Sequence, residues 1–373
     1  MDLNGHLDRH GAVLSIDLRA VVGNWWVLNG IAGPGRGCAA VVKADAYGVG
    51  LAPVARALWQ AGCQDFFVAL LEEGLALREI LPNAAIYVLT GANAATVDIF
   101  ARYRLKPVLN TPNQINVWLI ACQAQGEKLP AAIHVDTGMN RLGLAMGEAE
   151  ALAQEGRDAL RTMGIDLVMS HLACAEDRGH PKNQEQLAAF QDIRRRLPMG
   201  RASFANSSGI FLGPDFGFDL FRPGVALYGI NPTPDRENPM APVVRLQAKI
   251  IQVREVDSAM TVGYGATHVV AEKGRIATIA VGYADGYLRS LSSSGTVYIG
   301  DVPVPVVGRV SMDLVTLDVS HLPENQVRPG TVVDVIGPHN PADAVAAAAG
   351  TIGYEILTSL GARYYRHYEG SAS

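Results

Sequence analysis

Eight short apolar segments recur along the first 230 residues of the chain, and each but the last is followed by a stretch with helical periodicity. Short apolar runs of this kind are typical of parallel strands buried on both faces, with helices as the connections. An open, doubly wound sheet would show the same alternation, but the number of segments favours a TIM-like (β/α)8 barrel of about 220 residues. The expected strands are residues 39–42, 66–70, 85–89, 105–109, 131–135, 166–170, 204–205 and 225–230, and the expected helices are 19–31, 51–60, 72–81, 94–103, 112–125, 147–163 and 183–197.

The alternation ends at a proline-rich polar stretch, residues 231–239, which is typical of a domain boundary. Beyond it, strand-like segments are separated by turns rich in Gly, Pro, Asp and Ser, and Pro303 and Pro305 place one segment at a sheet edge. We expect a barrel domain over 1–240, a mainly β domain over 241–373, and residues 1–18 as a candidate strand of the second domain. The later elements are strands 243–256, 274–281, 296–299, 302–307, 314–319 and 331–336, and helices 342–349 and 354–360.

Composition excludes several classes of protein. With 49% hydrophobic and 18% charged residues, the chain can build large cores and is not a disordered protein. A net charge of −5 provides no basic field for nucleic acid or an anionic membrane. The N-terminus has no signal-peptide pattern, and no apolar run is long enough to span a membrane. The four cysteines are scattered without CxxC spacing, so we expect free thiols, no metal site and a cytoplasmic location.

Lys43 follows the apolar run 39–42 and precedes a turn into an amphipathic helix. At the carboxyl end of a parallel strand its amine would be partly desolvated, which lowers the pKa of a lysine and suits it to imine formation. Tyr47 and the backbone N–H groups near Gly48 and Gly50 could face a phosphate at the helix N-terminus. A surface lysine at a strand end is the alternative that this segment alone leaves open.

Polar residues follow four more of the expected strands, and in a barrel such positions converge on one mouth. Arg141, His171 and Arg222 each lie in a different one of these segments. Two arginines and a glycine/serine-rich loop indicate an anionic ligand, most simply a phosphate together with a carboxylate. A single arginine or histidine at a strand end is usually structural, but a coincidence across five strands is improbable. The four segments are 136–143, 170–176, 205–209 and 221–225.

With these residues and their order, the chain resembles the alanine racemase family, whose members combine a pyridoxal 5'-phosphate-binding barrel with a C-terminal β domain. The resemblance covers nearly the whole chain, and its blocks occur in the family's order. The blocks are VVKADAYG (41–48), DTGMNRLG (136–143), SHLA (170–173), ANS (205–207), RPG (222–224), VGYGA (262–266), GYADG (282–286), GRVSMD (308–313) and GYE (353–355).

The resemblance implies a two-base interconversion of L- and D-alanine. Lys43 would bind the cofactor covalently and act as one base, and Tyr264 would act as the second on the opposite face of Cα. His171 beside Arg222 would supply positive charge that lowers the pKa of the phenol. Arg222 would also pair with the pyridine nitrogen, leave it unprotonated and so make the ring a weaker electron sink.

The resemblance also implies roles for further residues. The phosphate would be bound by Tyr47, Ser207, Tyr354 and the backbone N–H groups of Gly224 and Val225. Arg141, with the N–H of Met312, would bind the substrate carboxylate, and Arg141 would also contact the cofactor's phenolic oxygen. The entrance would have an inner constriction and a polar outer ring. Its residues would be Tyr283 and Tyr354 inside, and Arg289, Arg309, Ile352 and Glu176 outside.

Two positions depart from the family pattern. His134 stands where many members have a lysine, carbamylated in some, that orients the arginine corresponding to Arg141. A neutral histidine offers an acceptor but no negative charge. Ser311 replaces a cysteine of some members, a change expected to be minor. The resemblance further implies a homodimer in which Tyr264 and Met312 reach the Lys43 of the other subunit.

Other readings remain open. A racemase acting on serine or lysine would share these motifs, although the periplasmic broad-specificity kind would carry a signal peptide. A decarboxylase of the same domain order is expected to have a cysteine acid in the second domain, whereas all four cysteines precede residue 175. A non-catalytic cofactor-binding regulatory protein would have lost Tyr264. The role of the enzyme, supplying D-alanine to peptidoglycan or degrading it, is not decided by the sequence.

Overall fold

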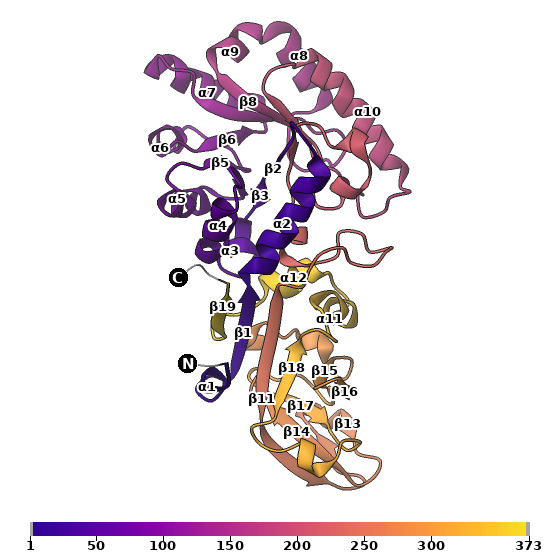
Figure 1. The fold of residues 1–373 in the computed structure, drawn as a ribbon. Helices are drawn as coiled ribbons and strands as arrows, with labels where there is room; N and C mark the ends of the chain where they lie inside the picture. The colour runs from indigo at the N-terminus through magenta and orange to yellow at the C-terminus, as the bar shows by residue number, and fades with distance from the viewer. Residues whose placement is uncertain (1–2, 371–373) are drawn as a thin grey trace. The chain divides into compact units, whose positions relative to one another are not determined.

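A computed structural model describes residues 3–370, in two compact units. Residues 21–46 and 50–241 form one, here called the barrel unit. The other, the β unit, comprises the described residues up to Ala20, the short stretch 47–49 and the chain from Pro242 onward. Figure 1 shows the elements of both. Among the described residues, no helix is long and apolar enough to cross a membrane, and the four cysteines are free thiols, as expected.

The barrel unit is built on seven parallel strands in the order β3-β4-β5-β6-β7-β8-β9, with helices on the outside of the strands (Figure 1). Strand β4 explains the continuous apolar runs of the sequence. Its residues Phe66, Phe67 and Val68 are all fully buried, as in a parallel strand covered on both faces. The strands are β3 (Ala40–Val41), β4 (Asp65–Val68), β5 (Ala85–Val88), β6 (Lys106–Leu109), β7 (Pro130–His134), β8 (Gly164–Met169) and β9 (Arg201–Ser203). This confirms the expected TIM-like architecture.

The eighth strand is not where the sequence placed it. Residues 225–230 form a buried 3-10 turn (Val225–Tyr228), and the strand is β10 (Leu220–Phe221), which pairs in parallel with β2 (Gly37–Cys38). Backbone hydrogen bonds from Gly37 to Asp219 (2.8 Å) and from Asp219 to Ala202 (2.9 Å) link β10 to both neighbours and close the ring. The apolar run 225–230 misled the prediction because its residues are buried without being extended.

The helices of the barrel unit agree with the expected pattern, with one break. The expected helix 147–163 is interrupted at Gly156, where an added Cβ would lie 2.7 Å from the carbonyl oxygen of Leu152. Two of the helices, α4 and α7, have the expected bounds. The helices are α2 (Leu18–Ala32), α4 (Leu51–Gln60), α5 (Leu71–Ile80), α6 (Val97–Arg102), α7 (Pro112–Gln125), α8 (Met146–Glu155), α9 (Arg157–Thr162) and α10 (Pro181–Arg196).

A network of paired charges lies near the amino ends of the barrel strands. Arg201 binds Asp65 through two hydrogen bonds, of 2.6 and 2.8 Å. Lys106 forms an ion pair with Asp166, and the buried hydroxyl of Tyr87 bonds to Asp166 (3.2 Å) and accepts from Arg201 (3.2 Å). Each cation of this floor network therefore has a carboxylate partner.

The β unit contains a sheet with the strand order β16-β15-β18-β11-β1-β19, and β14 joins β11 to β17. Strand β16 lies at the edge, as its two prolines predicted. Strand β1 pairs antiparallel with β11 and parallel with β19, and the sequence pattern does not indicate a strand at β19. The elements are α1 (Leu3–Leu7), β1 (Ala12–Asp17), β11 (Val244–Val256), β12 (Thr261–Val262), β13 (His268–Val269), β14 (Gly274–Ile279), β15 (Thr296–Ile299), β16 (Val302–Pro305), β17 (Val315–Asp318), β18 (Val332–Ile336), α11 (Ala342–Ala349), α12 (Gly353–Thr358) and β19 (Tyr365–Glu369).

Candidate active site

Lys43 begins a left-handed turn directly after β3. This turn, α3 (Lys43–Tyr47), has φ between 53° and 56° at Ala44, Asp45, Ala46 and Tyr47. A left-handed conformation costs roughly 1–2 kcal/mol for each such residue, and strain of this kind concentrates at functional sites. The Asp45 carbonyl accepts from Gly50 N–H (2.9 Å), so this amide, expected to face a phosphate, already has a protein partner.

The amine of Lys43 lies in a partly desolvated, positively charged environment. Burial lowers the pKa of Lys43, the charge of Arg141 lowers it further, and the carboxylate of Glu73 opposes both effects. Glu73 also accepts hydrogen bonds from the backbone N–H groups of Ala44 and Ala69, so it joins the turn to the end of β4. The expectation of a desolvated lysine with a lowered pKa is confirmed.

Arg222 is a buried cation without a carboxylate. Its guanidinium, in a side chain 4% exposed, donates to the hydroxyl of Ser203 and to the carbonyl of Ser170 (2.6 Å). Burial lowers the pKa of Arg222 to about 9, so the group remains charged at neutral pH. Among the described residues, no acidic side chain forms an ion pair with it. A charge left unpaired in this way favours an anionic or acceptor ligand.

His171 contacts Arg222 but does not add a charge to it. Its Nδ1 lies 3.4 Å from a guanidinium nitrogen of Arg222. Burial, and then the charges of Arg222 and Arg141, hold the pKa of His171 well below its usual range. The expectation that His171 contributes positive charge is therefore wrong, because a histidine beside a buried guanidinium stays neutral. The buried Gln186 positions this segment by donating to the carbonyl of His171 (2.9 Å).

Arg141 extends from a loop that folds back on the end of β7. Asp136 organises the loop, since its carboxylate accepts from the N–H groups of Gly138 (2.8 Å), Met139 (2.8 Å) and Asn140 (2.7 Å). The Arg141 side chain itself is exposed. The loop therefore presents a cation whose local carboxylate is already occupied by backbone donors.

His134 stands beneath this loop, 9% exposed, with Nδ1 2.8 Å from the Oδ1 of Asn110. Asn110 donates both amide hydrogens, to the carbonyls of Leu89 (2.9 Å) and Val108 (2.8 Å), so its oxygen must accept. His134 is thus protonated on Nδ1 and offers Nε2 as an acceptor. Burial, followed by the charge of Arg222, lowers the pKa of His134 to about 4. The neutral acceptor expected at this position is confirmed.

The segment after β10 brings a hydroxyl and backbone amides together. Ser207, 4% exposed, accepts from the N–H groups of Gly224 (3.0 Å) and Ala226 (3.3 Å) at the start of the 3-10 turn Val225–Tyr228. Three members of the expected phosphate set, Ser207, Gly224 and Val225, are therefore adjacent. The amides of Gly224 and Ala226 already donate to the Ser207 hydroxyl, so an anion bound at this turn would replace that hydroxyl as their acceptor.

Residues 47–49 belong to the β unit, where Tyr47 meets Tyr354 with ring centroids 6.1 Å apart. Burial, and then Tyr354, raise the pKa of Tyr47. Tyr283 and Met312 are also neighbours, since the N–H of Tyr283 donates to the carbonyl of Ser311 (3.0 Å). The fold of the β unit therefore brings together four of the predicted site residues in two pairs.

Tyr264 lies in a short turn, Tyr264–Ala266, and is 73% exposed. The positive φ of Gly263 and Gly265 shapes the turn, and a Cβ on Gly265 would lie 3.0 Å from the guanidinium of Arg309. Arg309, expected in the outer ring, thus packs against the turn that carries Tyr264. Arg289, Ile352 and Glu176 are exposed.

Sequence reasoning missed several residues that position the site. Asn110 follows β6 directly and Glu73 lies in the first turn of α5. Both are polar residues after strands, which is the signal that identified Lys43. Ser203 and Gln186 left no such signal, because the first is inside β9 and the second is on α10, far along the chain from its partners.

Comparison with known proteins agrees with this arrangement. Residues 16–232 match the alanine racemase N-terminal domain, and residues 243–368 match the alanine racemase C-terminal domain. An alanine racemase of Rhodospirillum rubrum is 52% identical over 98% of both chains, and a catabolic alanine racemase of Mesorhizobium japonicum is 49% identical over 96% of this chain and 94% of its own.

Solved structures show the same relationship. The alanine racemase of Bartonella henselae, with covalently bound pyridoxal phosphate, has a TM-score of 0.92 and 43% identity over 96% of this chain and 99% of its own. The biosynthetic enzyme of Pseudomonas aeruginosa has a TM-score of 0.88 and 35% identity over 96% of this chain and 99% of its own. The chain belongs to the alanine racemase family.

Proposed function

We propose that this protein is an alanine racemase that interconverts L- and D-alanine with pyridoxal 5'-phosphate. The observation that carries the proposal is that the barrel unit contains two groups of complementary use. One is the amine of Lys43, whose pKa is lowered, and the other is the buried guanidinium of Arg222, which has no carboxylate partner among the described residues. The barrel mouth therefore holds a nucleophilic amine and unpaired positive charge in one unit. Similarity over nearly the full length of a relative named alanine racemase supports the same activity.

The residues present fit pyridoxal 5'-phosphate. Lys43 would hold its aldehyde carbon, Arg222 its pyridine nitrogen, and Ser207 with the amides of Gly224 and Val225 its phosphate. Tyr47 and Tyr354 would complete the phosphate site. When bound, the cofactor withdraws electrons from Cα of the amino acid and so acidifies its proton. Arg222 keeps its own proton at neutral pH and would leave the pyridine nitrogen unprotonated, which moderates that withdrawal.

Racemisation requires a proton to leave one face of Cα and another to arrive at the other face. Lys43, with its lowered pKa, serves as the base on one face. Tyr264 serves on the other, and its exposure leaves the phenol accessible. The guanidinium of Arg309 lies beside the turn that carries Tyr264 and so places a cation near this side chain.

Arg141 and the N–H of Met312 would bind the substrate carboxylate. His134 would hold Arg141 through its Nε2 acceptor, in place of an anionic group. Tyr283 and Tyr354 would narrow the entrance to the size of alanine, with an outer ring of Arg289, Arg309, Ile352 and Glu176. A narrow, tyrosine-lined entrance favours small substrates over lysine.

We infer a homodimer with shared sites, in which Tyr264 and Met312 act on the Lys43 of the other subunit. Exposed apolar and aromatic side chains support this, since Tyr264, Met312 and Ile352 are 73%, 53% and 60% exposed. Surfaces of this kind usually become covered on association. Sedimentation equilibrium should give twice the monomer mass, and a monomer with full activity would contradict the shared site.

The decisive experiment is to incubate the purified holoenzyme with L-alanine in deuterium oxide. We expect loss of optical activity together with deuterium uptake at Cα, and much slower turnover of L-serine and L-lysine. Release of carbon dioxide would instead identify a decarboxylase. Retention of optical activity with all three amino acids would leave only cofactor binding and contradict the proposal.

A further inference from the structure

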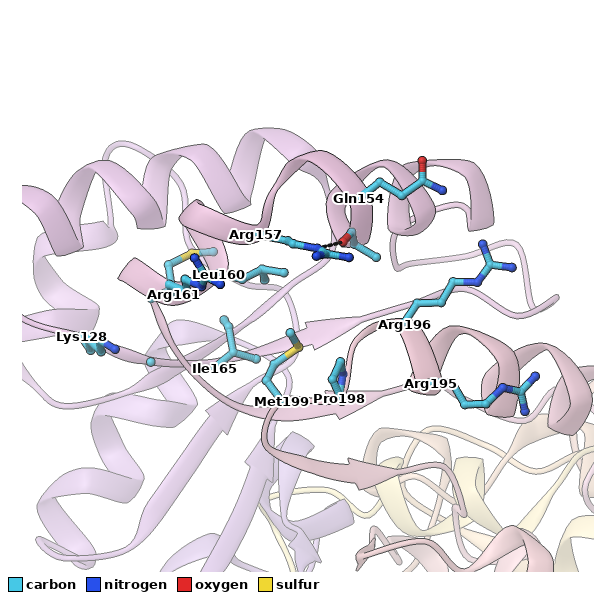
Figure 2. A pocket seen from close by; sticks show the side chains of 13 residues that line it. Lys128, Gln154, Arg157, Leu160, Arg161, Ile165, Arg195, Arg196, Pro198 and Met199 are labelled. Carbon is cyan, nitrogen blue, oxygen red and sulfur yellow. Dashed lines mark hydrogen bonds between the residues drawn. The ribbon is translucent and has the colours of Figure 1, made fainter.

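A cavity lies at the opposite end of the barrel strands from Lys43. It has a volume of about 790 Å³ and is bounded by the α8–α9 junction, the beginning of β8 and the end of α10 (Figure 2). The break at Gly156 and the short α9 leave this space open above β8. Its volume falls within the range of small-molecule sites.

The base of this cavity is apolar. Leu160, Met163 and Ile165 are 8%, 2% and 9% exposed, and Met199 lies beside Ile165 in Figure 2. Because these side chains are recessed, a flat surface cannot reach them. An apolar group must enter the cavity to cover them, which favours a free molecule over a membrane.

The rim is cationic. Its charged members are Lys128, Arg157, Arg161, Arg195 and Arg196, and no Asp or Glu lines the cavity. The last three have carboxylate partners outside the lining: Asp158, Asp192 and Glu150. Arg157 bonds only to the carbonyl of Ala153 (3.3 Å), and Lys128 has no ion pair among the described residues. In a chain of net charge −5, two free cations over an apolar base are complementary to an anion with an apolar tail.

We propose that this cavity is a binding site for a monomeric, single-chain anionic amphiphile. Its alkyl chain covers Leu160, Ile165 and Met199, and its carboxylate or phosphate head binds Arg157 and Lys128. The cavity lies at the amino ends of β7 and β8, whereas His134 and Met169 end these strands at the catalytic mouth. The ligand therefore binds independently of alanine, and the site does not depend on the proposed racemase activity.

The probe is decyl phosphate, titrated below its micelle concentration into the holoenzyme by calorimetry. We expect one molecule bound per chain, with unchanged affinity in saturating D-alanine. Inorganic phosphate and decyltrimethylammonium should bind at least about tenfold more weakly, because each lacks one half of the recognition. Absence of decyl phosphate binding, equal binding of decyltrimethylammonium, or competition with D-alanine would each overturn the proposal.

Variants assign the site to these residues. The double variant Arg157→Gln/Lys128→Gln should weaken decyl phosphate at least about tenfold, since both head-group contacts are lost. Met199→Glu should weaken decyl phosphate binding similarly, because it places a negative charge at the apolar base of the cavity. Arg56→Gln, an exposed arginine on α4, is the matched control and should bind as the parent does. Parental affinity in both cavity variants, with unchanged circular dichroism, would overturn the assignment.

Discussion

Both ends of the barrel contain charged side chains that are at least partly removed from solvent, and the two ends differ in what neutralises these charges. At the floor, Arg201 binds Asp65 and Lys106 binds Asp166. At the mouth, Arg222 is more deeply buried than either pair, yet its partners among the described residues are a hydroxyl, a carbonyl and a neutral histidine. Removing one member of a buried ion pair destabilises a fold, because the other charge is left without a partner. A buried cation that has no such partner is instead available to bind a ligand. The floor network is therefore structural and the mouth is functional.

The largest expected effect follows from Lys43→Ala at the mouth. It removes both the cofactor attachment and one base, so kcat/KM should fall by more than about 10⁴. Visible absorbance of bound cofactor should disappear. Compared with the cofactor-free parent, the variant should show unchanged or slightly higher stability in urea denaturation, because a desolvated cation is lost. Lys273→Ala, a surface lysine paired with Glu255, is the control. A large loss of stability in Lys43→Ala would show that the mouth is not purely functional.

Tyr264→Phe tests the second base without touching the barrel. We expect proton abstraction from L-alanine to slow by about 10²–10⁴, with little change in cofactor affinity, because only the phenolic oxygen is removed. Deuterium uptake at Cα from each enantiomer measures the effect. Tyr298→Phe on β15 should behave as the parent enzyme. An unchanged rate from L-alanine in Tyr264→Phe would eliminate the two-base assignment.

The neutral histidines of the mouth should make stability depend on pH. The folded pKa of His134 is about 4, below its ordinary value of 6.5, so the unfolded chain binds the proton more readily between these values. Stability from this residue is complete above about pH 6.5 and is lost as pH falls toward 4, by about 2–3 kcal/mol. His134→Asn should flatten urea-denaturation stability across this window. Equal slopes in His134→Asn and in the parent would contradict the lowered pKa of His134.

The smallest expected effect comes from the floor network, where a substitution should lower the stability of the fold and leave the activity nearly unchanged. Asp166→Asn leaves Lys106 without its carboxylate and should lower the free energy of unfolding by about 1–3 kcal/mol. The pair is partly exposed, at 18% and 33%, which keeps the effect moderate. Activity per folded molecule should stay within about twofold. Asp158→Asn, at a fully exposed pair, should cost less than about 0.5 kcal/mol. If Asp166→Asn lost most of its activity per folded molecule while its free energy of unfolding stayed unchanged, the distinction between the two ends would be wrong.

The sequence predicted much of this architecture from periodicity alone. The bounds of α4, α7 and α11 agree with those expected, because each helix has a clear apolar face or a proline or glycine at its end. The eighth strand was misplaced because Leu220–Phe221 is too short to show a pattern, while the longer run 225–230 is apolar for burial alone. Strand β19 was missed because its residues are half-buried and mostly polar.

The candidate site divides in the same way. Lys43, Arg141, His171 and Arg222 were identifiable because each is a polar residue after an apolar strand. The left-handed turn after Lys43 was not, since Ala-Asp-Ala-Tyr contains no glycine to indicate positive φ. The neutrality of His171 also escaped prediction, because a histidine's pKa depends on which charges surround it in space.

The sequence by itself determined the two-domain order, the barrel class, the family and the residue types available for chemistry. Those properties depend on local periodicity and on motifs that are contiguous in the chain. Only the tertiary structure decided which charges are neutralised, since ion pairs such as Asp65–Arg201 join residues that are distant in sequence. It also decided that Asn110 sets the tautomer of His134, and that a cationic cavity with an apolar base opens beside Gly156. Electrostatics and cavities depend on three-dimensional proximity, which a linear pattern does not contain.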